Sequence, residues 1–317
     1  MKGARPVALV TGASGFVGRH LVPILEAEGW IVRRASRAPA LTPDDVFIRS
    51  IGSTTDWKDV LVGVDAVVHL AARVHHHNDE RAVGLYREVN IQGTLHLARC
   101  AADAGVGHFI FVSTVLVHGR ANDGRAPFSE DNVLKPSGVY GMSKAAAESG
   151  LKYLARESDM PITVIRPPLV YGSGAKGNFK LLTMAVRRGI PLPFGSIRNR
   201  RAFLAVENLC WFIAERLTRP PRNFDVFLVA DEEQVSTPEF IRRLAGAVGI
   251  APRLIPAPIS LLGALLKFSG RPDARDSIIG SLELDVSKAA ATGWRPRVTL
   301  DEGLRLATAD VTGNNPP

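Results

Sequence analysis

Cysteine is scarce in this sequence: Cys100 and Cys210 are the only two among 317 residues. Neither lies in a cluster of possible metal ligands, so the sequence shows no cysteine-based zinc site and no disulfide framework. The three consecutive histidines His75, His76 and His77 cannot share one face of a regular element, and no cysteine or carboxylate completes a site with them. We therefore expect no metal, and a reduced, cytoplasmic setting.

Long apolar runs are also lacking. The run Ile259–Phe268 is about half as long as a helix that crosses a bilayer, and we expect it to pack inside a small lobe instead. The apolar residues after Arg5 stop at Thr11-Gly-Ala-Ser-Gly15, which is unlike a signal peptide. Low-complexity tracts and solenoid repeats are absent as well. The sequence therefore predicts a globular protein without a transmembrane segment.

Acidic residues are outnumbered, giving a formal net charge of +8 and a pI near 9.8. The basic residues are scattered, with no interleaved aromatic side chains and no nucleic-acid motif, so we expect no nucleic-acid partner. A positive protein attracts phosphate-rich small molecules. A weak association with an anionic membrane face stays open.

Short apolar strands alternate with helices through the first half of the chain. We expect strands at 6–10, 31–35, 65–70, 108–113 and 162–166, and helices at 15–29, 86–104 and 143–157. Pro23 should kink the first helix or mark a later start. The alternation predicts parallel βαβ units, and so an α/β fold with a Rossmann-type doubly wound parallel sheet. Because the pattern loosens after about residue 170, we expect a sheet domain at 1–170 and a smaller C-terminal substrate lobe at 171–317.

A glycine-rich turn, Thr11-Gly-Ala-Ser-Gly-Phe-Val-Gly18, follows the first strand and opens the first helix. In such turns the first glycine permits a tight bend, the second lets the backbone approach a pyrophosphate, and the third allows the helix to pack closely on the sheet. Free N–H groups at the helix N-terminus then face the phosphates. The turn predicts that residues 1–170 bind NAD(P), with contacts from Gly12, Ser14, Gly15, Phe16 and Val17.

The second strand ends without the acidic residue that usually holds the adenosine ribose of NAD. The equivalent position is Ser36, followed by Arg37. A hydroxyl and a guanidinium suit the 2′-phosphate of NADP. We therefore predict NADP as the cofactor, with NAD as the alternative.

Tyr140 and Lys144 lie four residues apart, so on a helix they share one face. A nearby ammonium should lower the pKa of the phenol toward the working range, and Tyr140 can then exchange a proton with a hydroxyl or carbonyl. Ser113 and Thr114 end the fourth strand, where a hydroxyl can bond the same substrate oxygen. Together with the glycine-rich turn, this combination predicts an oxidoreductase.

With these motifs in place, the sequence resembles the NAD-dependent epimerase/dehydratase branch of the extended short-chain dehydrogenases/reductases. The resemblance runs across nearly the whole chain and includes His69-Leu-Ala-Ala72, Asn90-Ile-Gln-Gly-Thr94 and Arg166-Pro-Pro-Leu-Val-Tyr-Gly172. It implies that Tyr140 is the acid/base, Lys144 holds the nicotinamide ribose and Thr114 positions the reacting oxygen. The cofactor would be bordered by Leu70, Ala71, Ala72 and Pro167, with Asn90 supporting the helix behind the site. His118 stands where the family usually has a tyrosine.

The resemblance also implies a nucleotide-activated sugar as substrate. Relatives bind a nucleoside diphosphate at the positions of Asn178, Phe194, Arg201 and Arg275. Phe194 would stack on the base, and Arg201 and Arg275 would grip the diphosphate. The alternatives are a buried loop anchor for Phe194 and a solvated turn for Arg201. Relatives often form homodimers through two helices, here near 86–104 and 143–157, and we expect the same.

Val115 and Leu116 stand where sugar dehydratases of this family carry an acidic pair, so dehydration is not expected. Our main prediction is NADPH-dependent reduction of a UDP-4-keto-6-deoxy-N-acetylhexosamine, because Ser36 and Arg37 suit an exchangeable NADPH. The alternatives are a UDP-hexose or UDP-N-acetylhexosamine 4-epimerase with tightly bound NAD, a reductase of a non-sugar carbonyl, and a non-catalytic NADP sensor.

Overall fold

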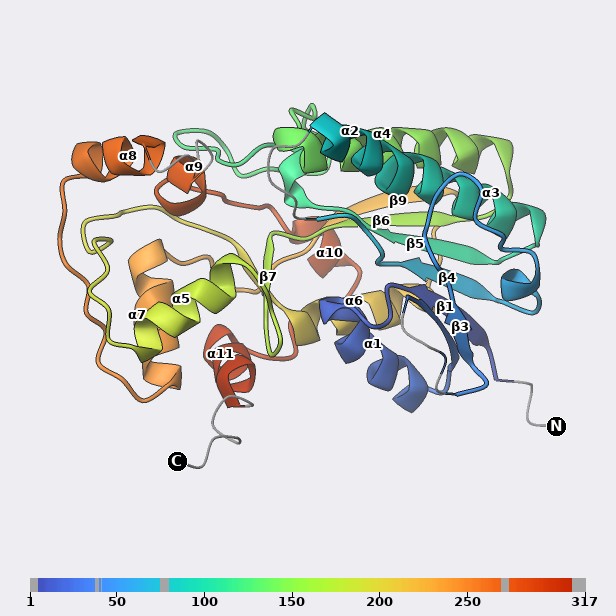
Figure 1. The fold of residues 1–317 in the computed structure, drawn as a ribbon, viewed down its shortest axis with the longest axis horizontal. Helices are drawn as coiled ribbons and strands as arrows, with labels where there is room; N and C mark the ends of the chain where they lie inside the picture. Colours follow the sequence, from blue (N-terminus) through green and yellow to red (C-terminus); the bar gives the residue numbers. More distant parts are fainter. Residues whose placement is uncertain (1–4, 38–39, 41, 75–79, 269–273, 310–317) are drawn as a thin grey trace. The chain divides into compact units, whose positions relative to one another are not determined.

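The computed structural model describes residues 5–37, 40, 42–74, 80–268 and 274–309 (Figure 1). The chain divides into two compact units. Unit 1 contains residues 1–118, 133–167 and 210–227, and unit 2 contains residues 119–132, 168–209 and 228–317. Each unit is therefore assembled from separate stretches of chain, and residues 210–227 return to the unit that holds the N-terminal half. The histidines at 75–77 lie outside the described residues.

A seven-stranded sheet with the order β3-β2-β1-β4-β5-β6-β9 forms the centre of unit 1. The strands are β1 (Val7–Thr11), β2 (Ile31–Ser36), β3 (Asp45–Phe47), β4 (Ala66–His69), β5 (His108–Val112), β6 (Ile162–Arg166) and β9 (Phe224–Leu228). Neighbours from β3 through β6 pair in parallel, which confirms the predicted doubly wound sheet. The strand order reverses between β1 and β4, and ligands of such sheets bind at this switch point, beyond the carboxyl ends of the strands.

Helices cover both faces of this sheet: α2, α3 and α4 lie on one face, and α1 and α6 on the other (Figure 1). Their bounds are α1 (Phe16–Ala27), α2 (Glu80–Tyr86), α3 (Thr94–Asp103), α4 (Gly138–Glu157) and α6 (Val206–Leu217), with 3₁₀ turns at Asp59–Leu61 and Val115–Val117 and a π-helical stretch at Arg87–Gly93. Pro23 lies inside α1, which begins at Phe16, so the later start that we considered is wrong.

The core of unit 1 lies between the sheet and the pair α3 and α4. Leu97 and Leu151 from these helices pack on Phe109, Phe111 and Val164 of the central strands. The covered strands are almost continuously apolar because both of their faces are buried. Trp57 is fully buried in the same cluster. No helix in the described part of the chain is long and apolar enough to cross a membrane.

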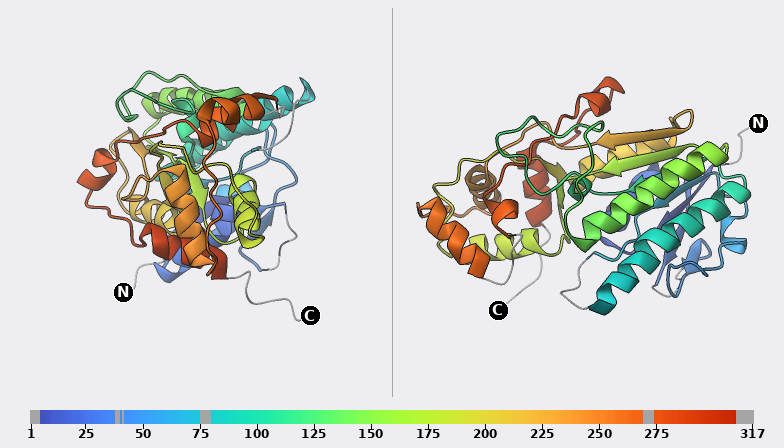
Figure 2. Two further views of the ribbon diagram at one scale, coloured as in Figure 1. Left: turned by 90° about the vertical axis from the view of Figure 1, so that its left-hand side faces the viewer. Right: turned by 90° about the horizontal axis from the view of Figure 1, so that it is seen from above.

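Unit 2 contains a two-stranded parallel sheet and six helices among its described residues. The strands are β7 (Leu169–Tyr171) and β8 (Phe203–Ala205), and the helices are α5 (Asn178–Arg187), α7 (Thr237–Ala247), α8 (Ile259–Phe268), α9 (Ala274–Ile278), α10 (Ser287–Ala291) and α11 (Leu300–Ala309). Both α5 and α11 pack against α7 (Figure 2). An aromatic cluster joins these elements, with the rings of Phe203 and Phe240 stacked 4.0 Å apart.

Within unit 2, a buried carboxylate links strands β7 and β8 to the first residues of α6, which belong to this unit up to Leu209. Asp231 accepts hydrogen bonds from the Tyr171 hydroxyl at 2.8 Å, the Ala205 backbone N–H at 3.0 Å and the Asn208 amide at 2.7 Å. Burial raises the pKa of Asp231 to about 6. Because every contact donates to it, the carboxylate can remain charged in an apolar setting.

Candidate functional site

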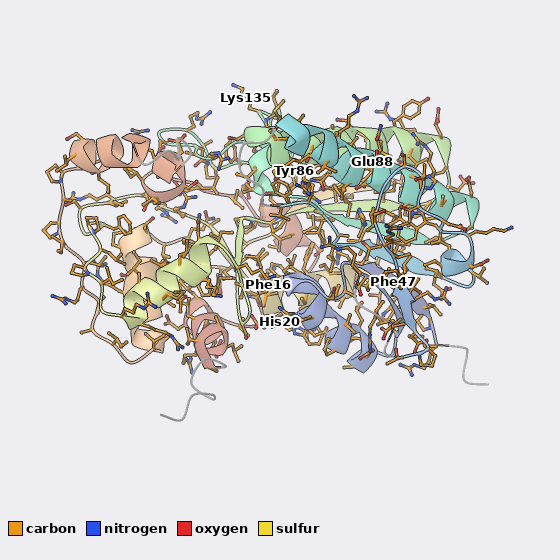
Figure 3. All side chains as sticks on the ribbon, viewed as in Figure 1. Phe16, His20, Phe47, Tyr86, Glu88 and Lys135 are labelled. Carbon is orange, nitrogen blue, oxygen red and sulfur yellow. The ribbon has the colours of Figure 1, made fainter. Side chains whose placement is uncertain are left out.

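The glycine-rich turn of unit 1 passes very close to the end of β4. Gly12 has φ +72°, and a Cβ atom there would lie 2.9 Å from the backbone nitrogen of Ala71. A Cβ atom on Gly18 would lie 2.6 Å from the Cα atom of Ala13, so only glycine lets α1 begin this close to β1. Phe16 and His20 follow on α1, their rings 5.7 Å apart edge to face (Figure 3). The turn leaves an α-helical N-terminus open, which fits a pyrophosphate.

A buried histidine links the turn to the strand beside it. His69 Nδ1 lies 2.7 Å from the Thr11 hydroxyl oxygen, and its Nε2 lies 3.0 Å from the Thr94 hydroxyl oxygen. Burial, and then the charge of Lys144, lower the pKa of His69 to about 3. The imidazole is therefore neutral, and it fixes Thr11, whose hydroxyl accepts a hydrogen bond from the Ala71 N–H at 3.4 Å.

The end of β2 carries three arginines with different surroundings. Arg33 donates to the backbone oxygens of Val60 and Val62, and Arg34 pairs with Glu26 and, at 3.7 Å, with Asp45. Arg37 is exposed and makes no hydrogen bond or ion pair within the residues that the structure describes, and Ser36 beside it is partly exposed. Of these three arginines, Arg37 is therefore the one whose guanidinium is available to bind a phosphate.

Tyr140 and Lys144 lie in the first two turns of α4, as the sequence predicts for one helix face. The helix begins at Gly138, five residues before the predicted start, so Tyr140 is held in its first turn. Lys144 is buried, and its Nζ donates to the Val112 backbone oxygen at 2.8 Å. The same Nζ lies 4.3 Å from the ring centre of Phe111 and 6.0 Å from that of Tyr140.

The expected direction of the Tyr140 pKa shift is wrong for the cofactor-free chain. Burial raises the pKa of the phenol well above its usual value. Burial also lowers the pKa of Lys144 to about 7, against a smaller opposing effect of Glu148. Lys144 is therefore only partly protonated at neutral pH, and burial is the main cause of the raised pKa of Tyr140.

Asn90 ties α4 to the loop after β4. It lies in the π-helical stretch before α3, and its amide donates to the Ser143 hydroxyl at 2.9 Å. Asn90 also accepts from the backbone N–H of Arg73 and donates to its backbone oxygen. These bonds fix residues 71–73 beside the glycine-rich turn. Leu70, Ala71 and Ala72 are partly exposed there.

Thr114 and Pro167 meet where β5 and β6 end. The Pro167 backbone oxygen accepts a hydrogen bond from the Val115 N–H at 2.9 Å. The Thr114 hydroxyl oxygen is 3.3 Å from the Leu116 N–H and caps the 3₁₀ turn. The hydroxyl hydrogen of Thr114 stays available to a ligand, because a capping oxygen only accepts.

Sequence reasoning missed a buried ion pair behind these residues. Arg166 Nη2 lies 2.7 Å from a Glu148 carboxylate oxygen, and Ser113 also hydrogen-bonds that carboxylate. Arg166 Nη1 lies 2.9 Å from His118 Nε2, and burial together with Arg166 lowers the pKa of His118 to about 4. His118 is therefore a neutral acceptor for Arg166. In the sequence, the signal for this ion pair was Glu148, which lies four residues after Lys144 and therefore on the same face of the helix.

The predicted diphosphate ligands lie in unit 2 and differ in exposure. Arg201 is buried, with Nη1 donating to the backbone oxygens of Gly280 and, at 3.0 Å, Asp276, and burial lowers its pKa to about 10. Arg275 is exposed and reaches the Asp276 carboxylate at 3.3 Å. Both arginines therefore contact Asp276. Because Arg201 is buried, the alternative of a solvated turn is wrong.

Asn178 and Phe194 are less constrained than the arginines. Asn178 is exposed at the first position of α5, whereas its neighbour Phe179 is buried against Tyr171. Phe194 is half-buried, so it is not a fully buried loop anchor. Across the described residues, no group of three or more His, Cys, Asp or Glu side chains is arranged to hold a metal ion.

Comparisons with known proteins show which family and which individual proteins the chain is similar to. The model of the NAD dependent epimerase/dehydratase family matches residues 8–229. A UDP-glucose 4-epimerase of Vibrio cholerae is 39% identical over 97% of this chain and 96% of its own length. An N-acetyl-alpha-D-glucosaminyl-diphospho-ditrans,octacis-undecaprenol 4-epimerase of Escherichia coli O157:H7 is 27% identical over 93% of this chain and 92% of its own. The solved structure of MoeE5 in complex with UDP-glucose and NAD is 26% identical, with a TM-score of 0.78, over 96% of this chain and 98% of that one.

Proposed function

The chain belongs to the NAD dependent epimerase/dehydratase family, and we propose that it is an NADPH-dependent reductase of a UDP-4-keto-6-deoxy-N-acetylhexosamine. The family uses a nicotinamide cofactor and acts on nucleotide-activated sugars. Carbon 4 is supported by the names of both curated relatives, which are 4-epimerases.

The end of β2 is the observation that carries the choice of cofactor. Strand β2 ends at Ser36 without a carboxylate for the ribose 2′-hydroxyl, and Arg37 follows with no competing ion pair in the described residues. A phosphate bound by Arg37 gains charge-assisted hydrogen bonds that a hydroxyl cannot provide. These features favour NADP, which suits a single net reduction.

Gly12, Gly15 and the N-terminus of α1 would hold the pyrophosphate, and Ala71 and Pro167 would border the nicotinamide half. When bound, NADPH supplies the hydride. Tyr140 donates the proton to the ketone oxygen, which becomes the carbon 4 hydroxyl. Its raised pKa keeps the phenol protonated at neutral pH, so it is ready to donate in the direction of reduction.

Thr114 and Lys144 complete the proton chemistry. The Thr114 hydroxyl hydrogen-bonds the same ketone oxygen and sets its distance from Tyr140. Lys144, held by the Val112 backbone oxygen, would donate to the ribose and keep Tyr140 oriented. Val115 and Leu116 offer no acid or base next to Thr114, so dehydration is not proposed.

A UDP-hexose 4-epimerase is the second candidate, favoured by the Vibrio cholerae relative. An epimerase keeps its cofactor bound and begins by removing a proton from the carbon 4 hydroxyl. Tyr140 would then have to be deprotonated first. MoeE5 was solved with UDP-glucose and NAD, which also suits this candidate.

Cofactor titration of the variant Arg37→Ala tests the proposal. Loss of a charge-assisted contact should weaken NADP binding by about 10- to 100-fold and leave NAD binding unchanged. Arg156→Ala, an exposed arginine at the end of α4, is the matched control and should change neither. A wild-type protein that prefers NAD, or an equal loss for both cofactors, would contradict the proposal.

A further inference from the structure

Helix α8 is apolar except for Ser260 and Lys267, yet some of its apolar side chains face solvent. Its sequence is Ile-Ser-Leu-Leu-Gly-Ala-Leu-Leu-Lys-Phe. Helices of this kind are normally buried. Leu262 is buried, but Ile259 is 43% exposed and Leu261 is 56% exposed. Our expectation that this segment packs inside the lobe is therefore wrong for Ile259 and Leu261.

The segment leading into α8 carries further exposed aliphatic side chains. It runs from α7 to α8 beside residues 190–195 (Figure 1), with the Leu192 N–H bonded to the Arg253 oxygen at 2.8 Å and the Ile255 N–H bonded to the Leu192 oxygen at 2.9 Å. Ile190 is 45% exposed and Ile255 is 49% exposed. We call Ile190, Ile255, Ile259 and Leu261 the apolar edge.

The stretches of chain that carry the apolar edge contain basic but no acidic residues. Asp and Glu are absent from the sequence at 168–206 and 240–268, the stretches that include the four residues of the edge, whereas α9, which packs on α8, carries the pair Arg275 and Asp276. The basic residues in these stretches are Lys176, Lys180, Arg187, Arg188, Arg198, Arg200, Arg201, Arg242, Arg243, Arg253 and Lys267. All acidic residues of unit 2 therefore lie elsewhere in its sequence.

Two exposed arginines adjoin the apolar edge directly. Arg253 lies between the hydrogen-bonded segments, and its Nη1 donates to the Gly189 backbone oxygen at 3.3 Å. Arg188 stands two residues before Ile190. Neither forms an ion pair within the described residues, whereas Arg242 and Arg243 are paired with Glu239. Arg188 and Arg253 thus offer uncompensated charge next to exposed aliphatic side chains.

We propose that the apolar edge docks on the surface of an anionic lipid bilayer. Aliphatic side chains enter the boundary between headgroups and acyl chains, and neighbouring arginines bind the acidic headgroups. The exposed large apolar side chains here are aliphatic, which disfavours a single-stranded nucleic acid because base stacking needs aromatic rings. Pairing with a second copy through this edge would bring like charges together across the symmetry axis. The proposal is independent of the proposed reaction.

Co-sedimentation of the full-length protein with vesicles tests this proposal. We expect binding to phosphatidylglycerol-containing vesicles that weakens as salt is added, and much weaker binding to pure phosphatidylcholine vesicles. The double variant Ile259→Gln/Leu261→Gln should lower the partition coefficient by about tenfold or more, because buried aliphatic surface is lost. Arg188→Gln and Arg253→Gln should each lower it by about fivefold.

Matched controls come from α11 in the same unit. Leu306→Gln and Arg305→Gln change an exposed leucine and an exposed arginine away from the apolar edge, and both should bind as the wild type does. Absence of binding to anionic vesicles, or an equal loss in the controls, would overturn the proposal. So would a concentration-dependent dimer in sedimentation velocity that Ile259→Gln/Leu261→Gln abolishes, since the edge would then be a contact between copies.

Discussion

The side-chain amine of Lys144 is buried, and its burial makes the stability of the protein depend on pH. Its pKa falls from 10.5 to about 7 on burial. Between these values the unfolded chain binds a proton that the folded chain lacks, so the contribution of Lys144 to stability rises with pH. Below pH 7 both states are protonated, and the full cost of burying the charge is present.

The variant Lys144→Met removes this cost. We expect the free energy of unfolding of the variant, minus that of the wild type, to be greatest near pH 6. This difference should fall by on the order of 3–5 kcal/mol as the pH rises to about 10. Loss of the bond to the Val112 oxygen adds an offset that does not depend on pH. Urea denaturation at several pH values measures the trend. Lys152→Met, an exposed lysine of the same helix, should show none of it.

Tyr140 is the residue on which the chemical step depends. Tyr140→Phe keeps the ring in α4 and removes only the hydroxyl, so kcat should fall by about 10²- to 10⁴-fold while cofactor binding and melting temperature stay near those of the wild type. Tyr153→Phe is the control, because that ring lies on the same helix and is 61% exposed. Undiminished turnover by Tyr140→Phe would show that Tyr140 is not the proton donor, whereas a wild type without any turnover would point to a non-catalytic NADP sensor.

At the level of elements, the junction of β1 and α1 sets the cofactor site. Gly12→Ala forces a side chain into positive φ and against the Ala71 backbone, so we expect a loss of about 1–3 kcal/mol in unfolding free energy and no measurable NADP binding. Gly246→Ala in α7 is the control: its Cβ meets nothing within 4 Å, and it should stabilise by about 0.5–1 kcal/mol. Wild-type affinity in Gly12→Ala would show that the turn does not bind the cofactor.

The strands, the glycine-rich turn and the shared face of Tyr140 and Lys144 were predictable because each depends on local pattern. The π-helical stretch at Arg87–Gly93 could not be predicted in this way, because it goes with a hydrogen bond from Asn90 to Ser143, which is distant in the sequence. The same holds for the pair Glu148 and Arg166, which the register of β6 brings together. The direction of the Tyr140 pKa shift also depended on packing, because the sequence shows the spacing of two groups but not how much water surrounds them.

At the level of the whole molecule, the sequence shows a net charge of +8 but not where it gathers. The basic residues look scattered along the chain. Residues 190–195 pair with 253–255, and this pairing brings together two stretches of sequence without acidic residues, so that Arg188 and Arg253 lie beside exposed aliphatic side chains.

The most direct test of the central claim is the reaction itself. Purified protein is mixed with a UDP-4-keto-6-deoxy-N-acetylhexosamine and NADPH, and absorbance and product are followed together. Our account predicts that one NADPH is consumed for each carbon 4 hydroxyl formed, and that no turnover occurs without added cofactor. Protein that carries NAD from purification and interconverts UDP-hexoses with no addition would contradict it and establish the 4-epimerase instead.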